Sequence, residues 1–597
     1  MYLPDLYEGN LETVQTTTFL GYNHNPIIAD GEMYDMKNLS SGKFPLLSVR
    51  NKRYVQSYGN STMSGIHGRD QLVLVQGEQV YWGFAPVPGL TVSAQPSMCP
   101  KKIVSMGAYV CIWPDKVYFN TIDLRDCGSM ERLYSVDGSS VSAVMCRGDG
   151  TNYDFSQIYI GSEAPSSPSN GMLWMDTSAE KNILKQYYTS TGEWSLVEST
   201  YVKLSANGIG ANLKEYDVVD LTGMVANSTN VRVLDEVNTL NTSMIVYQRS
   251  DNYIVVAGFL SQPTSMQAGT VRADLKVPDL DFIVESNNRL WGCKYGLENG
   301  VVVNEIRACK LGDFRNWQCF MGLSSDSYAA SCGTDGAWTG AVTQLNYPVF
   351  FKEGCIHRVS GSMPANFQIT TTMCRGVQDG SWRSVCVVNE AIYYKSRQDI
   401  MMYDGSMPVS VSAQLGGLLY SNARAGSLHN KYYISMVDAD GEWHQFVYDI
   451  EKQLWHKEDN FQAYGYGAVS DTLYAIDEQS NSLVQLIGTG GEGWEQEEDF
   501  EWEAVFGLFG TDYVNQKYLS RFNIRMSLGK KSTAGLWIRY DEEKDWHFEG
   551  AIKVPAMSTF MIPVVPRRCD HLQFKIAGTG SVNIYSLARI LEVGGDG

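Results

Sequence analysis

The chain is poor in charged residues and poorer still in basic ones. Only 19% of its 597 residues are charged, and 47 lysines and arginines stand against 66 aspartates and glutamates, which leaves a net charge of −19. Proteins that grip nucleic acid need clustered lysine and arginine to displace counterions, so we predict that this chain does not grip DNA. Low charge combined with 12% aromatic residues indicates a packed, β-rich protein and excludes a disordered one.

Long apolar runs and secretion signals are missing as well. No run approaches the ~18 apolar residues that a membrane-spanning helix needs, so we predict no membrane partner. The N-terminal stretch has neither a basic region nor an apolar core, and we expect no secretory signal there. The twelve cysteines include no Cys-x-x-Cys pair, and several lie inside apolar runs, for example Cys111 and Cys386. We predict buried thiols that stay reduced in a cytoplasm.

The common catalytic and ligand-binding motifs are also lacking. The eight histidines form no His-x-x-x-His pair, and the serine-hydrolase elbow, the phosphate-binding loop and the zinc-protease motif do not occur. Asp570 and His571 have the chemistry of a catalytic pair, but neighbouring residues on a strand point to opposite faces. We therefore predict no catalytic residue, no metal and no cofactor, and expect that the chain is not an enzyme. The two carboxylates of a glycosidase cannot be picked out among so many acids.

Short alternating runs of apolar and polar residues, separated by turn-forming residues, make up most of the sequence. This pattern is typical of all-β proteins, and three clear hairpins cover 71–83, 109–120 and 431–450. The apolar pair in the first strand of each hairpin recurs at steps of mostly 37 to 43 residues, close to the roughly 40–45 residues of a four-stranded propeller blade. We predict a β-propeller of about 6–8 blades.

Two regions interrupt the propeller pattern and set the predicted domain boundaries. The stretch 151–280 breaks the repeat, and seven acids with no base at 492–503 indicate a solvated linker. Beyond the acids, the strands fit a separate β-sandwich of about 100 residues. The predicted segments are an N-terminal arm with the first propeller strand (1–50), a first group of blades (51–150), an inserted small β-module or modules (151–280), a second group of blades (281–490) and a C-terminal β-sandwich (491–597).

The segment 161–199 contains a short aromatic-rich meander inside the predicted insertion. Its aromatic side chains include Trp174, Tyr187, Tyr188 and Trp194. A unit this small needs aromatic residues simply to form a core, and this is the interpretation that we favour. Stacking of Trp174, Tyr187 and Trp194 on sugars is the alternative, and it would make the segment a carbohydrate-binding module.

Two segments within 281–318 carry a family resemblance. An Asn-Arg-Leu turn at Asn288 is followed by a Lys-x-Gly-Asp-Phe-x-Asn-Trp turn that begins at Lys310. In this order they resemble a signature of β-propellers from the neck and tail nozzle of short-tailed bacteriophages, the tail tubular proteins and packaged-DNA stabilisation proteins. The resemblance implies an architectural role, in blade turns and the packing beneath them, for Asn288, Arg289, Gly312, Asp313, Asn316 and Trp317. The inserted module and the long C-terminal region depart from the compact short-tailed pattern.

The resemblance implies a structural protein of a bacteriophage tail, located in the virion after synthesis in the host cytoplasm. It would form a homo-oligomeric ring, five- or sixfold, at the tail nozzle, the tail tip or the head–tail neck, and would surround or close the DNA channel. Its expected partners are further copies of itself and other tail or neck proteins, with DNA nearby but not specifically bound. A receptor-binding tail protein that recognises host glycans is the alternative, and a propeller glycosidase is the second alternative.

Overall fold

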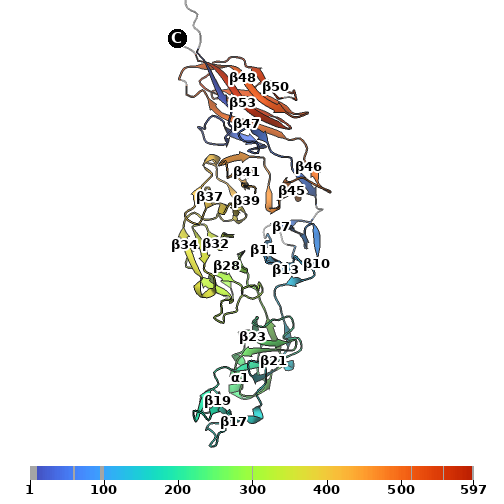
Figure 1. Cartoon of the computed structure of the whole chain (residues 1–597), viewed down its shortest axis with the longest axis vertical. Helices are drawn as coiled ribbons and strands as arrows, with labels where there is room; N and C mark the ends of the chain where they lie inside the picture. Colours follow the sequence, from blue (N-terminus) through green and yellow to red (C-terminus); the bar gives the residue numbers. More distant parts are fainter. Residues whose placement is uncertain are drawn as a thin grey trace, which may run out of the picture. The chain divides into compact units, whose positions relative to one another are not determined.

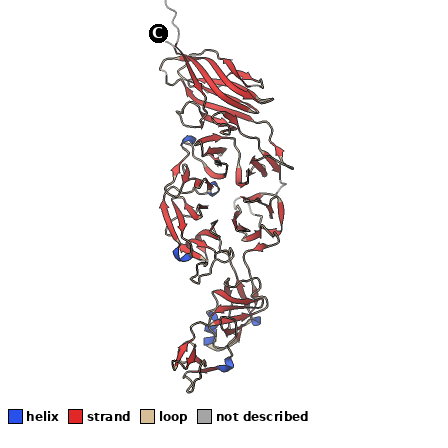
Figure 2. Cartoon of the chain, in the orientation of Figure 1, coloured by secondary structure: helices blue, strands red, loops and turns tan. Residues whose placement is uncertain are grey.

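The computed structural model describes residues 10–57, 61–94, 100–298, 300–512, 514–555 and 557–593. Nearly all of its regular structure is β-strand (Figure 2). As predicted, the fold is a β-propeller with an inserted β-module and a terminal β-sandwich (Figure 1). The first nine residues of the predicted N-terminal arm lie outside the described residues. The chain divides into two compact units, the first made of Met1–Ser105, Thr334–Ser360 and Ile369–Gly597, the second of Met106–Gly333 and Gly361–Gln368.

Seven sheets within the described residues have the form of propeller blades. The first unit holds five: β7 Met63–Gly68, β8 Leu72–Gln76, β9 Gln79–Trp82 and β10 Ala85–Thr91; β31 Gly340–Gln344, β32 Tyr347–Lys352, β33 Cys355–Ser360 and β34 Gln368–Met373; β35 Cys386–Val388, β36 Ala391–Lys395, β37 Ile400–Tyr403 and β38 Val409–Ser410; β39 Ser421–Leu428, β40 Lys431–Val437, β41 Trp443–Asp449 and β42 Leu454–Lys457; β43 Ala463–Val469, β44 Thr472–Asp477 and β45 Ser482–Ile487 with β6 Tyr54–Ser57. The second unit holds most of the other two: β11 Lys102–Met106, β12 Tyr109–Trp113, β13 Val117–Asn120 and β14 Cys127–Ser129; β27 Phe282–Ser286, β28 Arg289–Glu298, β29 Val301–Ala308 and β30 Tyr328–Ser331.

The first hairpin in four of these blades turns through the same kind of two-residue loop. Both loop residues have positive φ angles at Asn287–Asn288, Leu345–Asn346, Asn389–Glu390 and His429–Asn430. This backbone geometry matches a type I′ turn, whose twist suits the flanking strands, and asparagine tolerates positive φ better than most residues. Asparagine in the turn, followed by a strand of large apolar residues, is therefore the local signal of a blade in this sequence.

The last blade is completed by a strand from the N-terminal part of the chain. β6 pairs antiparallel with β45, so that Tyr54 lies opposite Gln485 and Ser57 opposite Ser482. The short β46 (Glu495–Gln496) pairs with β6 as well. The first propeller strand of the sequence is therefore 54–57, and the prediction that placed it within 1–50 is wrong.

The segment 1–50 instead supplies strands to the terminal β-sandwich. One sheet contains β1 Asn10–Thr16, β4 Leu39–Ser40, β5 Leu47–Val49, β48 Lys517–Leu528, β51 Met557–Pro563 and β53 Val582–Val593; the other contains β2 Gly21–Tyr22, β3 Glu32–Lys37, β47 Glu501–Phe509, β49 Thr533–Tyr540, β50 His547–Ile552 and β52 Leu572–Thr579. Phe522 of the first sheet packs against Phe574 of the second, with ring centroids 5.0 Å apart. The predicted sandwich of 491–597 is thus corrected to one built from both ends of the chain.

The second unit carries a domain inserted between its two blades. The larger sheet contains β15 Ser135–Asp137, β16 Ser142–Cys146, β21 Tyr201–Ser205, β22 Val218–Thr222, β23 Ser243–Ser250, β24 Tyr253–Ala257, β25 Thr264–Ser265 and β26 Thr270–Asp274; the smaller contains β17 Ile158–Gly161, β18 Leu173–Asp176, β19 Ile183–Tyr188 and β20 Glu193–Leu196. Because β15 pairs with β26 and β16 with β21, the insertion begins near 135 and not at the predicted 151.

The helical content is small. The α-helix α1 (Val231–Asn238) buries Val233 and Val237 in the core of the inserted domain. Short 3₁₀ turns occur at Gly138–Ser140, Phe155–Gln157, Pro364–Asn366, Trp382–Ser384 and Ala413–Leu415. Within the described ranges, no helix combines the length and the apolar composition that crossing a membrane requires.

An ion-pair network holds the two segments that run between propeller and sandwich in the first unit. Arg50 donates to both carboxylate oxygens of Glu497, at 2.7 and 2.8 Å. Arg53 donates to Glu458 and to Asp459, each at 2.7 Å. The two arginines are only 5% and 6% exposed. Removal of one member of such a buried set leaves an uncompensated charge inside the protein.

The acidic run at 492–503 lies between the last blade and the sandwich, and most of its acids are exposed, as expected of a solvated linker. Some of its acids are nevertheless paired with bases. Besides Glu497, Asp499 pairs with Lys52 at 2.6 Å and Glu503 with Lys575 at 3.1 Å. The partner bases come from segments far away in the sequence, so the run looked uncompensated when it was considered alone.

Replacement of Arg53 by alanine is expected to destabilise the first unit by about 3–5 kcal/mol, because Glu458 and Asp459 lose their buried partner. Thermal and urea unfolding of the full chain measure the effect. The matched control is Arg125→Ala, whose side chain is exposed and whose loss should change stability by less than about 0.5 kcal/mol. Equal unfolding curves for the two variants would contradict the role of the network.

The network also predicts a pH dependence. Burial alone would raise the pKa of Asp459, but the guanidinium groups of Arg53 and Arg50 outweigh burial and hold this pKa below its ordinary value. Such a group stabilises the fold above its unfolded pKa of about 3.9, and the stability is lost as the pH falls through the folded pKa. The stability gap between wild type and Arg53→Ala should therefore narrow between neutral pH and about pH 3. Denaturant unfolding across this range measures it, and a constant gap would refute the prediction.

Candidate functional site

The two motif segments of the phage-like signature meet in one blade of the second unit. Asn288 lies in the turn between β27 and β28, and its carbonyl oxygen accepts the N–H of Gly312 at 2.9 Å. The φ angles of the two residues are 58° and 74°, a conformation that glycine and asparagine adopt most easily. Arg289 is buried and donates to three carbonyl oxygens between residues 309 and 326, at 2.6 to 2.8 Å. Its guanidinium thus ties the turn to the loop that follows β29.

The other motif residues shape that loop. The Asp313 carboxylate accepts the backbone N–H of Arg315 at 3.2 Å. The buried Asn316 side chain donates to the carbonyl oxygen of Tyr216, in the inserted domain, at 2.7 Å. The Trp317 ring is 4% exposed, and its indole N–H donates within the loop at 2.8 Å. The structure therefore brings all six motif residues together, as one turn and one loop of a blade.

The aromatic residues of 161–199 lie in the small sheet β17–β20. The Trp194 ring contacts Trp174 and Tyr187 at centroid distances of 5.4 and 5.3 Å, with interplanar angles of 68° and 56°. Trp174 is buried, and its indole N–H donates to the carbonyl oxygen of Gly161 at 2.9 Å. Tyr187 and Trp194 are half-buried. The three residues that were candidates for sugar stacking thus form a tilted, partly buried cluster and not a coplanar platform.

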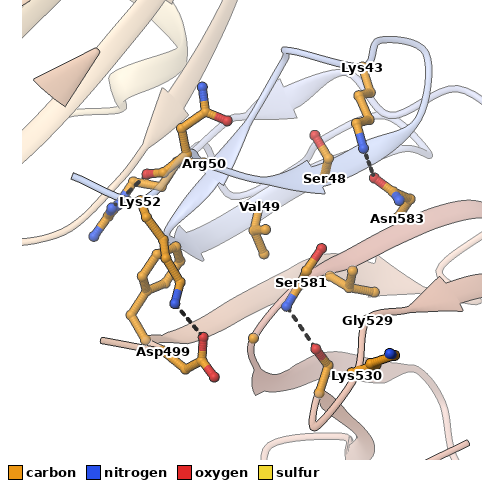
Figure 3. Close-up of a pocket in the computed structure, with 15 residues that line it drawn as sticks. Lys43, Ser48, Val49, Arg50, Lys52, Asp499, Gly529, Lys530, Ser581 and Asn583 are labelled. Carbon is orange, nitrogen blue, oxygen red and sulfur yellow. Dashed lines mark hydrogen bonds and ion pairs between the residues drawn. The ribbon is translucent and has the colours of Figure 1, made fainter. Parts of the chain in front are cut away.

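A first pocket opens in the first unit beside the sandwich, and we call it the sandwich pocket (Figure 3). Its volume is about 350 Å³, and it lies where segments 48–52 and 499–500 meet the hairpin turns at 529–532 and 580–583. Its charged lining residues are Lys43, Arg50, Lys52, Asp499 and Lys530.

Part of this charge is compensated. Lys52 and Asp499 form an ion pair, and Arg50 is held by Glu497 outside the lining. Lys43 donates to the neutral amide oxygen of Asn583 at 2.8 Å (Figure 3). The sandwich pocket therefore has an excess of positive charge, although two of its four cations, Arg50 and Lys52, are already paired.

A second pocket lies in the second unit, between the blade β11–β14 and the inserted domain, and we call it the blade–insert pocket. Its volume is about 480 Å³. Its charged lining residues are Glu131, Arg132, Lys214, Arg249 and Arg315. Sequence reasoning named none of them. The sequence offered one indication: Arg315 lies between Phe314 and Asn316 of the Lys-x-Gly-Asp-Phe-x-Asn-Trp turn.

Asp570 and His571 lie closer together than the sequence predicted. The Nδ1 atom of His571 is 3.0 Å from a carboxylate oxygen of Asp570. Both residues precede β52, which begins at Leu572, so the alternation of a strand does not apply to them. Their backbone N–H groups both donate to the carboxylate of Asp541. The predicted opposite orientation is wrong, and the pair forms part of a surface turn of the sandwich.

No family model and no curated protein matches the chain. Solved structures that it resembles include an exo-β-1,3-galactanase from Phanerochaete chrysosporium (7% identity, 51% of this chain and 94% of that chain, TM-score 0.21) and a GH43 glycoside hydrolase with engineered active site (9%, 52% and 98%, TM-score 0.19). A sialidase from Trypanosoma rangeli is another (8%, 96% and 95%, TM-score 0.21). At such low sequence identities and TM-scores, the similarity concerns the fold alone.

One prediction is corrected. Each of the three neighbours is named as an enzyme that acts on carbohydrates, so the expectation that the chain is not an enzyme is withdrawn. Their names do not include bacteriophage neck or tail proteins, so the resemblance to those proteins stays a prediction.

The loop after β29 supplies a test of its architectural role. Trp317→Ala should destabilise the chain by about 3–5 kcal/mol, because a large buried ring is replaced by a cavity. Phe320→Ala in the same loop is the control, since the Phe320 ring is 56% exposed. Thermal unfolding of both variants measures the difference, and melting of Trp317→Ala at the wild-type temperature would show that the loop does not depend on this ring.

Proposed function

We propose that the chain is a bacteriophage tail protein that binds an acidic glycan. The observation that carries the glycan part is the charge of its pockets. The net charge of the chain is −19, yet the sandwich pocket and the blade–insert pocket are each lined by four cations and one carboxylate. A cleft lined by one sign of charge concentrates ligands of the opposite sign.

Neutral polar groups favour a glycan over a simple ion. Ser532 and Asn583 line the sandwich pocket, and Ser129, Asn212 and Tyr118 line the blade–insert pocket. Hydroxyl and amide groups exchange hydrogen bonds with sugar hydroxyls, and a few polar groups placed in this way fix the orientation of a small ligand.

The tail part of the proposal rests on the sequence resemblance. What supports it is the shared use of the six motif residues, which together build one turn and one loop. Such a role is architectural, as the resemblance implies, and it is separate from the charge that lines the pockets.

Binding of short oligosaccharides to the full chain tests the glycan part. We expect acidic oligosaccharides to bind and neutral ones of equal length to bind at least tenfold more weakly, with the acidic binding weakened between about 0.05 and 0.5 M salt because the charges are screened. Calorimetry measures the affinities, and release of reducing ends is followed in the same samples to separate binding from hydrolysis. Equal affinity for neutral and acidic sugars would contradict the proposal.

Purified phage particles test the tail part. We expect mass spectrometry to find the chain in particles that have been separated from host lysate, and an antibody to label one end of the tail or the neck. Its absence from washed particles, together with its presence in the lysate, would remove this part of the proposal without affecting the glycan part.

A further inference from the structure

The blade–insert pocket has more unpaired positive charge than the sandwich pocket. Its one carboxylate, Glu131, already accepts the Lys116 ammonium at 2.9 Å and the backbone N–H of Val277 at 3.1 Å. Arg249 pairs with Asp251 at 3.2 Å. Both of these lining residues are therefore engaged before any ligand enters.

The other three charged lining residues are cations that no carboxylate contacts as an ion pair among the described residues. Within the part of the chain that the structure describes, no ion pair involves Arg132, Lys214 or Arg315. Burial lowers the pKa of Arg132, and the like charge of Arg315 adds to the lowering, while Tyr134, Asp274 and Asp217 oppose it. Like charges that converge on one cavity repel each other, and an anion between them would remove the repulsion.

Two carboxylates near the pocket accept hydrogen bonds from backbone groups. Asp217 accepts the backbone N–H of Lys214, and Asp313 accepts that of Arg315. Neither residue lines the pocket. They hold the backbone behind the two cations. Asp217 attracts the Lys214 and Arg315 side chains electrostatically, but among the described residues neither carboxylate forms an ion pair with them.

Arg315 is held in a way that leaves its terminal nitrogen atoms available. Its Nε–H donates to the carbonyl oxygen of Met130 at 3.0 Å, and no bond of its two terminal nitrogen atoms occurs within the described residues. On either side of it in the sequence, Asp313 and Asn316 fix the loop. The guanidinium is thus positioned in advance, so a ligand does not have to order it.

Arg132 is fixed from the other side of the pocket. Its terminal nitrogens donate to the carbonyl oxygens of Gly208 at 2.7 Å and Ala273 at 3.4 Å. The guanidinium carbon lies 4.9 Å from the centroid of the Tyr134 ring. Neutral partners therefore hold this cation in place without cancelling its charge.

We infer that the blade–insert pocket binds the carboxylate of a sugar acid, with Arg315 as the bidentate ligand and with Arg132 and Lys214 as supporting charges. The inference rests on the proposed glycan binding and names its ligand class and its site. The planar fork of a guanidinium matches the two oxygens of a carboxylate. The volume of about 480 Å³ accommodates a monosaccharide unit beside the Tyr118 ring, which also lines the pocket.

Calorimetry with the full chain tests this inference. The probe is a glucuronate-terminated trisaccharide, and the matched ligand is the same trisaccharide with its carboxylate reduced to an alcohol. We expect the reduced ligand and the variant Arg315→Gln each to weaken binding by about 10- to 100-fold, as for the loss of a charged hydrogen bond. Arg315→Lys keeps the charge but loses the fork and should fall between wild type and Arg315→Gln.

Further variants and one further ligand separate the outcomes. Lys214→Gln changes an exposed side chain, so it should weaken binding severalfold even if Arg315→Gln unfolds, and thermal unfolding of each variant shows which of them are folded. Lys530→Gln alters only the sandwich pocket and therefore reports whether the trisaccharide binds there. Arg125→Gln alters an exposed arginine of neither pocket and should bind as wild type. A sulfated trisaccharide that binds as tightly as the glucuronate would show a general anion site and overturn the choice of carboxylate.

One result would overturn the assignment of the sugar acid to the blade–insert pocket. If Lys530→Gln loses binding while the folded Arg315 and Lys214 variants keep it, the acid lies in the sandwich pocket, and the proposed function survives without this inference. If wild type binds neither the glucuronate ligand nor any other acidic oligosaccharide, the proposed function fails and takes the inference with it.

Discussion

The pairing of β6 with β45 is the contact on which the architecture of the first unit depends. It joins residues 54–57 to residues 482–485, more than 400 positions along the chain. Once the strands are paired, the segment before β6 and the segment after β46 leave the blade side by side, and both can enter one sandwich. Arg50 and Arg53 fix this exit, since they bind Glu497 and Asp459 across the same separation. The entropy cost of closing so long a loop rises only slowly with its length.

The sequence predicts those parts of the fold that are encoded locally. Paired strands with an asparagine turn indicate four of the seven blades described, because the type I′ geometry and the apolar strand both lie within about ten residues. The origin of β1–β5 in the sandwich could not be predicted, since strands that pair with β53 or β47 look the same as strands that pair with a neighbour. The acidic run shows the same limit: its partners, Lys52 and Lys575, become visible only when distant segments meet.

The same distinction between local and distant residues decides which parts of the candidate site could be predicted. The motif residues around Gly312 could be identified because they are contiguous and ordered, and the structure places them in one loop. Arg315 lies inside that loop, but its significance depends on Arg132 and Lys214, which stand far away in sequence and converge only in the folded unit. A single basic residue between turn residues carries no signal by itself. Asp570 and His571 illustrate the opposite error, in which the rule of strand alternation was applied to residues that precede the strand.

The acidic composition and the cationic pockets act at different distances. At physiological ionic strength the Debye length is about 8 Å, so most of the net charge of −19 is screened from a ligand already inside a cavity. The ligand then responds to the lining, in which Arg132, Lys214 and Arg315 have no ion pair among the described residues. A long acidic polymer differs, because the parts of it outside the cavity remain near a predominantly negative surface. Such a surface would hold an acidic glycan by single residues while repelling the rest of the chain, which favours recognition of a terminal sugar acid over binding along a polymer.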